Sequence, residues 1–160
     1  MTITVPGPDD LGWMHALNEA HAVELSSMSA AAFADHLARA RLVRCATPEA
    51  GFLIACDQDS DYHSPNFLWF RARHQRFLYI DRVVVAPAAR GRGLARGFYE
   101  ALFALARTEG YPMLACEVNS DPPNPASDAF HAALGFAPVG SARLEDRGKT
   151  VTYLACPAAT

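Results

Sequence analysis

The sequence predicts an α/β fold in which helices flank one mixed sheet of parallel and antiparallel strands. The first observation is an apolar, β-branched run over residues 77–85, which is typical of a strand buried on both faces. The second is an amphipathic helical pattern over 94–109, which ends at Gly110 as a helix commonly does. The third is another apolar run, over 113–118. Together they predict a right-handed strand–helix–strand unit whose strands are parallel.

The first half of the chain adds helices and a hairpin. Apolar side chains recur at helical spacing in two segments, and two apolar runs flank a short turn-forming segment that contains proline. The elements expected here are a strand at 2–5, helices at 11–22 and 29–40, and hairpin strands at 42–46 and 51–56.

The remaining elements follow from turn residues and apolar runs. A proline-rich break at 122–125 precedes a short helix that Gly135 ends, and Gly148 lies near the tip of a later turn. The elements expected are helices at 66–74 and 127–134, strands at 136–139 and 150–156, and a turn at 145–149. The sheet therefore has six or seven strands, flanked by about four helices.

Composition indicates one domain spanning residues 1–160. Apolar residues make up 51% of the chain and charged residues 19%, which is enough apolar side chain for a packed core. The formal net charge of −3 argues against a nucleic-acid binder, because such proteins usually carry a basic surface.

The four cysteines, Cys45, Cys56, Cys116 and Cys156, each fall in an apolar strand-like run and form no C-x-x-C pair. They are interpreted as buried thiols in a reducing compartment, not as disulfides or a metal site. The first ten residues lack the pattern of a signal peptide, and no apolar run is long enough for a membrane span. We therefore expect a cytoplasmic protein that does not associate with membranes.

The segment 83–95 is the most informative for function. It combines the end of a buried strand, a tight turn and the start of a long helix. The first N–H groups of a helix lack internal partners, and the helix dipole adds positive potential there. Gly91 and Gly93 carry no Cβ, so a ligand can approach the backbone closely. This segment therefore predicts a cradle for a phosphate or pyrophosphate.

Three motifs in this half of the chain resemble one family. Arg90-x-x-Gly93-x-Ala95 matches the Q/R-x-x-G-x-G/A signature of the GNAT superfamily of acyl-CoA-dependent N-acyltransferases. Val83-x-Val85-x-Pro87 stands before it, where the family has its central strand. A segment similar to the family's second cofactor motif follows: Asn124, Ser127, Phe130 and His131, then Leu134-Gly135-Phe136.

The resemblance implies a GNAT-like, mostly antiparallel sheet in which one parallel pair of strands splays apart around a cleft. It implies acetyl-CoA as cofactor, a primary amine as the acetyl acceptor, and a possible homodimer. The pantetheine arm would pair with the strand backbone, and the pyrophosphate would lie on the N–H groups of residues 90–95. The cofactor-binding residues that it implies are Val83, Val84, Val85, Arg90, Gly91, Arg92, Gly93, Leu94, Ala95, Asn124, Ser127 and Phe130.

Two carboxylates and one histidine are candidates for catalysis. The attacking amine must lose a proton, and a carboxylate beside the cleft can accept it. Asp81 is one candidate because it precedes Val83 by two residues and should share a strand face with it; Glu117, on the neighbouring strand, is the other. Each is alternatively a structural carboxylate. His131 stands where the family usually has tyrosine, so it either donates a hydrogen bond to the leaving sulfur or only packs beneath the cofactor.

Two further alternatives stay open. The aromatic segment 61–70 is either a lid over the amine site or a secondary core against the sheet. A protein with this fold is either an acetyltransferase or a sensor that binds acyl-CoA without transferring the acyl group.

Overall fold

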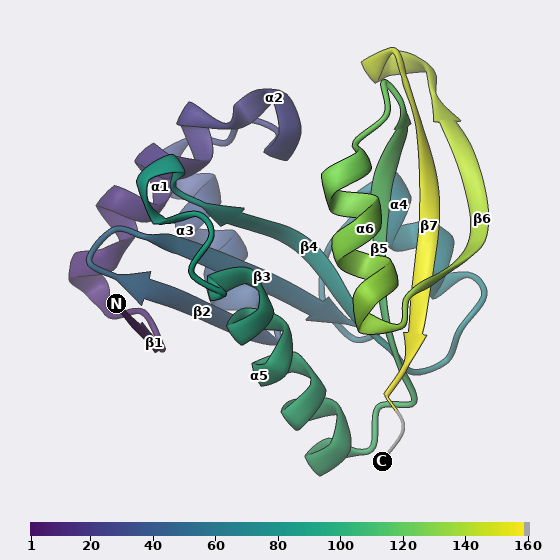
Figure 1. Cartoon of the computed structure of the whole chain (residues 1–160), viewed down its shortest axis with the longest axis horizontal. Helices are drawn as coiled ribbons and strands as arrows, with labels where there is room; N and C mark the ends of the chain where they lie inside the picture. Colours follow the sequence, from purple (N-terminus) through teal and green to yellow (C-terminus); the bar gives the residue numbers. More distant parts are fainter. Residues whose placement is uncertain (159–160) are drawn as a thin grey trace.

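A computed structural model describes residues 1–158, whose strands form one sheet of seven in the order β1-β2-β3-β4-β5-β7-β6 (Figure 1). Its strands are β1 (Thr2–Thr4), β2 (Leu42–Thr47), β3 (Gly51–Asp57), β4 (Leu78–Val85), β5 (Met113–Asp121), β6 (Ala137–Leu144) and β7 (Lys149–Pro157). Among these seven strands of the described residues, only β4 and β5 pair in parallel, and the other neighbours are antiparallel. The predicted mixed sheet and its parallel pair are confirmed.

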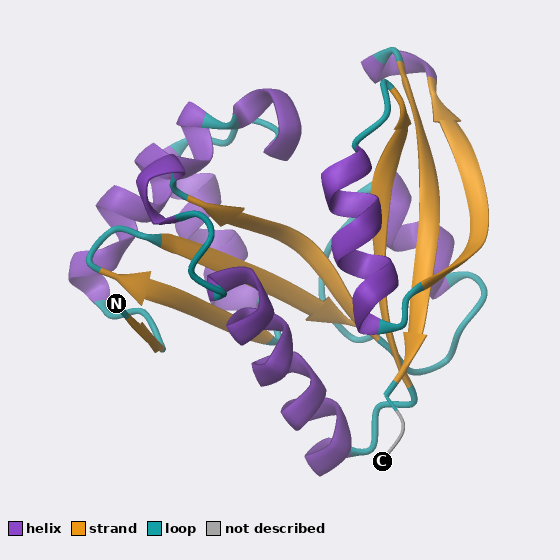
Figure 2. Ribbon diagram, viewed as in Figure 1, coloured by secondary structure: helices purple, strands orange, loops and turns teal. Residues whose placement is uncertain are grey.

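Helices cover both faces of the sheet (Figures 1 and 2). The described residues form α1 (Leu11–Ala20), α2 (Ala22–Leu25), α3 (Ala30–Arg39), α4 (Pro65–Arg71), α5 (Leu94–Glu109) and α6 (Pro125–Leu134). Helices α5 and α6 lie on one face, whereas α1, α3 and α4 lie on the other. The sequence predicts about four helices, and the described residues form six; the one that no pattern indicates is α2, a single turn after α1, which is too short to show a periodic pattern.

Helix α5 is held against the sheet by its apolar face. Phe98 and Leu102 are fully buried there, and burying such side chains contributes about 1.5–3 kcal/mol each. The helix ends at Gly110, whose φ of 76° is a left-handed conformation that glycine adopts without steric penalty. The start of α5 is therefore fixed beside the end of β4.

Strands β4 and β5 part soon after they meet. Their register contains only the pairs Leu78–Leu114 and Tyr79–Ala115, and beyond these the two strands diverge (Figure 1). Among residues 1–158 no strand takes the place of β5 along the rest of β4, so one edge of β4 has no backbone partner there.

A β-bulge in β4 changes which way its side chains point. On β3, the adjacent residues Ile54 and Ala55 pair with Arg82 and Ile80, so Asp81 is an extra residue in β4. Ile80 packs on the α5 side, and after the bulge Val83 also packs on that side. Asp81 contacts residues of the opposite face instead, so the expectation that it shares a face with Val83 is wrong.

Several element bounds differ from those expected. Strand β6 continues to Leu144, and the predicted turn before β7 is a short 3-10 helix over Glu145–Arg147 that ends at Gly148. Within residues 1–158, no helix has both the length and the apolar character needed to cross a membrane.

Candidate functional site

A cleft of about 230 Å³ opens where β4 and β5 part. Six of the predicted site residues line it: Asp81, Val83, Glu117, Asn124, Ser127 and His131. The turn 90–95 lies outside this cleft, at the start of α5, and Val84 packs with α1 and α3 on the opposite face of the sheet. The structure thus brings both carboxylates and the histidine to one cavity.

The turn before α5 presents free backbone donors. Gly91 and Gly93 have φ angles of 79° and 77°, and Gly93 is the N-cap of the helix. Within the described residues, the N–H groups of 91–96 donate to no protein acceptor. The first backbone hydrogen bond at the N-terminus of α5 runs from Gly97 N to Gly93 O, at 3.0 Å. A Cβ built on either glycine would project into open space, so the cradle is free of side chain at both positions. This arrangement fits a pyrophosphate.

The free edge of β4 can be assigned to particular residues. Ala86 N donates to Ala50 O at 2.8 Å, which directs residue 86 toward β3. Backbone groups alternate along a strand, so the polar groups of Val85 and Val83 face the edge that β5 has left. An extended ligand can hydrogen-bond to such an edge as an added strand would. On that side Arg90 Nε reaches Val85 O at 3.3 Å.

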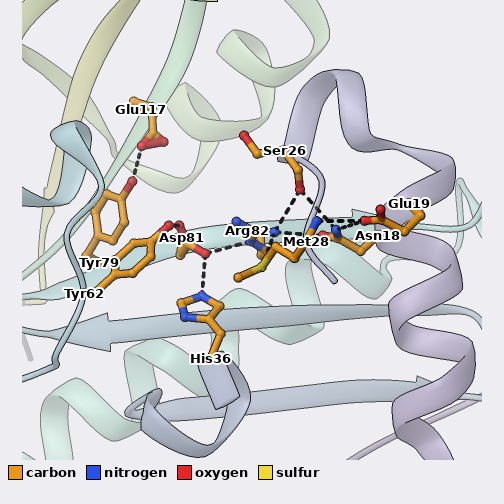
Figure 3. A network of polar contacts seen from close by, with 10 residues as sticks. All are labelled: Asn18, Glu19, Ser26, Met28, His36, Tyr62, Tyr79, Asp81, Arg82 and Glu117. Atoms are coloured by element: carbon orange, nitrogen blue, oxygen red, sulfur yellow. Dashed lines mark hydrogen bonds and ion pairs between the residues drawn. The ribbon is translucent and has the colours of Figure 1, made fainter. Parts of the chain in front are cut away.

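Asp81 is enclosed by three donors (Figure 3). His36 Nε2 and Arg82 Nε each lie 2.8 Å from its Oδ2, and the Tyr62 hydroxyl donates to Oδ1 at 2.5 Å. Burial raises the pKa of this carboxyl, but the hydrogen bonds and the Arg82 charge outweigh burial, and the net pKa lies below its ordinary value. Asp81 is therefore an ionised carboxylate whose oxygens are already occupied.

Arg82 extends this network to the loop after α2. Its Nη1 donates to Asn18 Oδ1 at 2.9 Å and approaches Ser26 O at 3.3 Å. Asn18 Nδ2 in turn donates to Ser26 O at 3.1 Å (Figure 3). The pair Asp81–Arg82 thereby joins β4 to the segment that forms one wall of the cleft.

Glu117 has a different environment. It comes from β5, and its one side-chain partner among the described residues is the hydroxyl of Tyr79, which donates to Oε1. The pKa of Glu117 is raised to about 7; burial is the main cause and the negative charge of Asp81 adds to it, while the Tyr79 hydrogen bond acts in the opposite direction. A carboxyl with a pKa near neutrality can both accept and release a proton at physiological pH.

His131 forms a pair with Tyr99. Its Nδ1 lies 2.8 Å from Ser127 O, a carbonyl that can only accept, so Nδ1 carries the hydrogen. Burial lowers the pKa of His131, so the ring is neutral and Nε2 accepts from the Tyr99 hydroxyl at 2.7 Å. Both ring nitrogens are thus engaged, which leaves His131 no N–H to offer a ligand. The hydroxyl in this pair belongs to Tyr99, which also lines the cleft.

The aromatic segment 61–70 forms a core. Phe67 and Phe70 are fully buried, and Trp69 stacks on Tyr153 of β7 with ring centroids 4.3 Å apart. Of this segment, Tyr62, Ser64 and Asn66 line the cleft, whereas Phe67, Trp69 and Phe70 do not. The secondary core is the alternative that the structure supports.

Comparisons with solved structures give the same fold. The chain superposes with a TM-score of 0.72 on the ribosomal-protein-S18-alanine N-acetyltransferase of Escherichia coli, at 20% identity, covering 99% of this chain and 94% of the other. Ard1 of Thermoplasma volcanium gives a TM-score of 0.75 at 15% identity, with 99% and 98% covered. An aminoglycoside 6'-N-acetyltransferase in complex with coenzyme A gives 0.72 at 14% identity, with 100% and 98% covered.

At such identities the likeness is one of fold alone. A search of curated protein sequences finds no match. The model of the acetyltransferase (GNAT) family, however, matches residues 50–136, which is more than half of the chain and includes β4, the cradle and α6. The chain therefore belongs to the GNAT acetyltransferase family.

Proposed function

We propose that this protein is an N-acetyltransferase that moves an acetyl group from acetyl-CoA to a primary amine. The observation that carries the proposal is the cleft between β4 and β5, where Glu117 lies beside a strand edge without a partner. Similar structures hold coenzyme A or acetyl-CoA, which supports this choice of acyl donor.

The backbone supplies the cofactor site in this proposal. The N–H groups of 91–96 hold the pyrophosphate, and the free edge of β4 at Val83 and Val85 holds the pantetheine arm. Asn124 and Ser127 line the cleft at the start of α6, and Phe130 packs behind them against Tyr99. Acetyl-CoA supplies an activated acetyl thioester when it is bound.

Glu117 is the general base in this proposal. A lysine-like amine has a pKa of about 10.4 and an α-amine one of about 8, so either is mostly protonated at neutral pH. Glu117 accepts the proton that the amine loses as its C–N bond forms and the C–S bond breaks. Asp81 serves as a positioning residue, because its oxygens are already bonded and its low pKa makes it a weaker base than Glu117.

Tyr99 is the hydroxyl in the cleft that can serve the leaving sulfur; its single O–H donates to His131 Nε2 in this structure and must turn away from His131 to donate to the sulfur. Burial raises the pKa of Tyr99 well above its ordinary value, so the phenol keeps its proton. A thiol has a pKa of about 8.5. The thiolate takes its proton from solvent, and a hydrogen bond from Tyr99 forms only when the one to His131 is given up, so the contribution of Tyr99 is modest.

A thiol-release screen tests the proposal. The protein is incubated with acetyl-CoA and a panel of small amines, peptides and aminoglycosides, and free thiol is measured. Amine-dependent release supports transfer, whereas saturable acetyl-CoA binding without release on any amine would identify a sensor.

The cofactor site has its own test. Gly93→Asp places a carboxylate in the cradle and should weaken CoA binding by roughly 100-fold or more, measured by calorimetry. Gly110→Asp is the matched control, since Gly110 has the same left-handed φ, 76° against 77°, at the other end of α5. Equal CoA affinity in the two variants would refute the assignment of the cradle.

A further inference from the structure

The two faces of β5 divide the cleft into two sides. Cys116 belongs to the core beneath α5 and α6, whereas Ala115 belongs to the core beneath α4. Side chains alternate along a strand, so Glu117 points to the α4 side, and its cross-strand partner Tyr153 lies in that same core. The Tyr99–His131 pair lies on the α5 and α6 side. The base therefore faces one side of the cleft, and this pair lies on the other side of the same cleft.

The Glu117 side of the cleft contains a cation. Lys149, the only lysine of the chain, begins β7 two residues before Val151, which lies in the α4-side core. Lys149 lines the cleft together with Arg147 of the preceding turn. In residues 1–158 neither side chain forms an ion pair or a hydrogen bond, whereas the nearby Arg143 is paired with Asp121 and Glu145.

Lys149 is also within electrostatic reach of Glu117. Burial is the main influence on the pKa of Glu117 and raises it, but the charge of Lys149 acts in the opposite direction and lowers it. The base and an unpaired ammonium thus share one side of the cleft.

Asn66 adds a fixed hydrogen-bond donor to the same side. Its Oδ1 accepts from the Tyr153 hydroxyl at 2.8 Å, which identifies Nδ2 as the amide atom left over. Nδ2 has no partner in the described part of the chain, although Asn66 is only 5% exposed. Every fully buried side-chain nitrogen and oxygen in the described residues has a hydrogen-bond partner. Because Nδ2 has none, it is not fully buried, and it is open to the cleft that Asn66 lines.

We propose that the acceptor is a small primary amine that also carries an anionic group. Its amine lies at Glu117, and its anion is held by Lys149, Arg147 and the amide of Asn66. An α-amino acid is the simplest molecule with this pattern, and an aminoalkyl phosphate shares it. This inference rests on the proposed transferase function and names the substrate class of the same site.

Matched pairs of amines test the inference. The first pair is L-alanine and L-alaninamide, and the second is phosphoethanolamine and ethanolamine. At least one anionic member should show a kcat/KM roughly tenfold or more above that of its neutral partner, because a charge-assisted contact is lost in the neutral one. The comparison of alanine with alaninamide is stringent, because the α-amine of alaninamide loses its proton more readily and this favours the neutral member of the pair.

A variant connects the preference to the site. Lys149→Gln should reduce the anionic-to-neutral ratio of kcat/KM; the ratio at one pH is the readout, because loss of the Lys149 charge also raises the pKa of Glu117 and affects both members of a pair. Arg107→Gln, on the exposed end of α5, is the matched control for loss of one positive charge and should keep the ratio. Direct calorimetric binding of alanine to the CoA-loaded protein should weaken in Lys149→Gln.

The outcomes separate this inference from the proposed function. Equal use of both members of each pair, a preference for neutral amines or peptides, or a preference that survives Lys149→Gln would overturn the inference while transferase activity stands. Absence of thiol release with every amine would overturn the proposed function and this inference with it.

Discussion

Replacing Glu117 with glutamine removes the carboxylate that we expect to accept the proton of the amine, while it keeps the shape of the side chain. General bases contribute about 10²–10⁴-fold to a rate, so kcat/KM for thiol release should fall by about that factor. In the wild type, kcat/KM should rise with pH through about 7, because Glu117 acts only when ionised. The variant should lack this rise and retain only the ionisation of the amine.

The same substitution should change stability in a pH-dependent way. The folded pKa of Glu117, about 7, lies above the ordinary value of 4.5, so the fold favours the protonated carboxyl. Below 4.5 both states are protonated and folding has no penalty from this group. Between 4.5 and 7 the unfolded chain ionises first, so the free energy of unfolding falls as pH rises, by up to about 3 kcal/mol. Glu117→Gln should not show this loss.

The predicted changes in activity and in stability of Glu117→Gln can both be measured in solution. Thiol release is followed with a single amine between about pH 5 and 9, and urea unfolding is followed over the same range. Glu109→Gln, an exposed position at the end of α5, is the control for loss of one carboxylate. The reasoning is refuted if Glu117→Gln keeps the activity of the wild type, or if the difference in unfolding free energy between the two proteins is the same at pH 5 and pH 8.

Three other substitutions have defined outcomes. Tyr79→Phe removes the hydrogen bond that lowers the pKa of Glu117, so the rise in kcat/KM should move to higher pH; an unmoved profile would contradict the contact. Asp81→Asn leaves the buried Arg82 without its charge partner and should lower the free energy of unfolding by about 3–5 kcal/mol in urea titrations; a loss below about 1 kcal/mol would show that the pair is dispensable. Tyr99→Phe should reduce kcat less than about tenfold, since a thiolate leaves without full protonation; a loss as large as that of Glu117→Gln would reverse the assigned roles.

Local patterns in the sequence were sufficient to predict most of the fold. The hairpin β2–β3 and the helix α5 follow from apolar periodicity and turn residues within a few positions of each other. The cradle also follows from local chemistry, because a glycine turn that leads into a helix exposes backbone donors wherever it occurs. These features depend on neighbours in the chain, which is the information that one sequence contains.

The direction of Asp81 could not be predicted in this way. The strand 78–85 is apolar on both faces, and Val83, Val84 and Val85 follow one another, so no alternation reveals an inserted residue. The bulge becomes visible only in the register with β3. The consequence is large, because the bulge places Asp81 and Arg82 together among the residues of α3 and the loop after α2.

The role of Tyr99 depends on a contact that spans 32 positions in the chain. From sequence, Tyr99 is one more aromatic residue on an amphipathic helix, and His131 is the residue at the position of the family's tyrosine. One signal was available: a histidine at that position has no hydroxyl, so a tyrosine elsewhere near the cleft was worth seeking. Only the packing of α5 against α6 identifies which one.

The two carboxylates of the cleft illustrate how one site can assign different roles to similar groups. Asp81 has a lowered pKa because His36, Arg82 and Tyr62 stabilise its charge, whereas Glu117 has one neutral side-chain partner among the described residues and a pKa of about 7. The permanent charge of Asp81 is itself one cause of the raised pKa of Glu117. Environments that separate the pKa values of two neighbouring acids also separate a structural anion from a proton acceptor. Neutralising Asp81 should therefore make Glu117 a weaker base as well as loosen the fold.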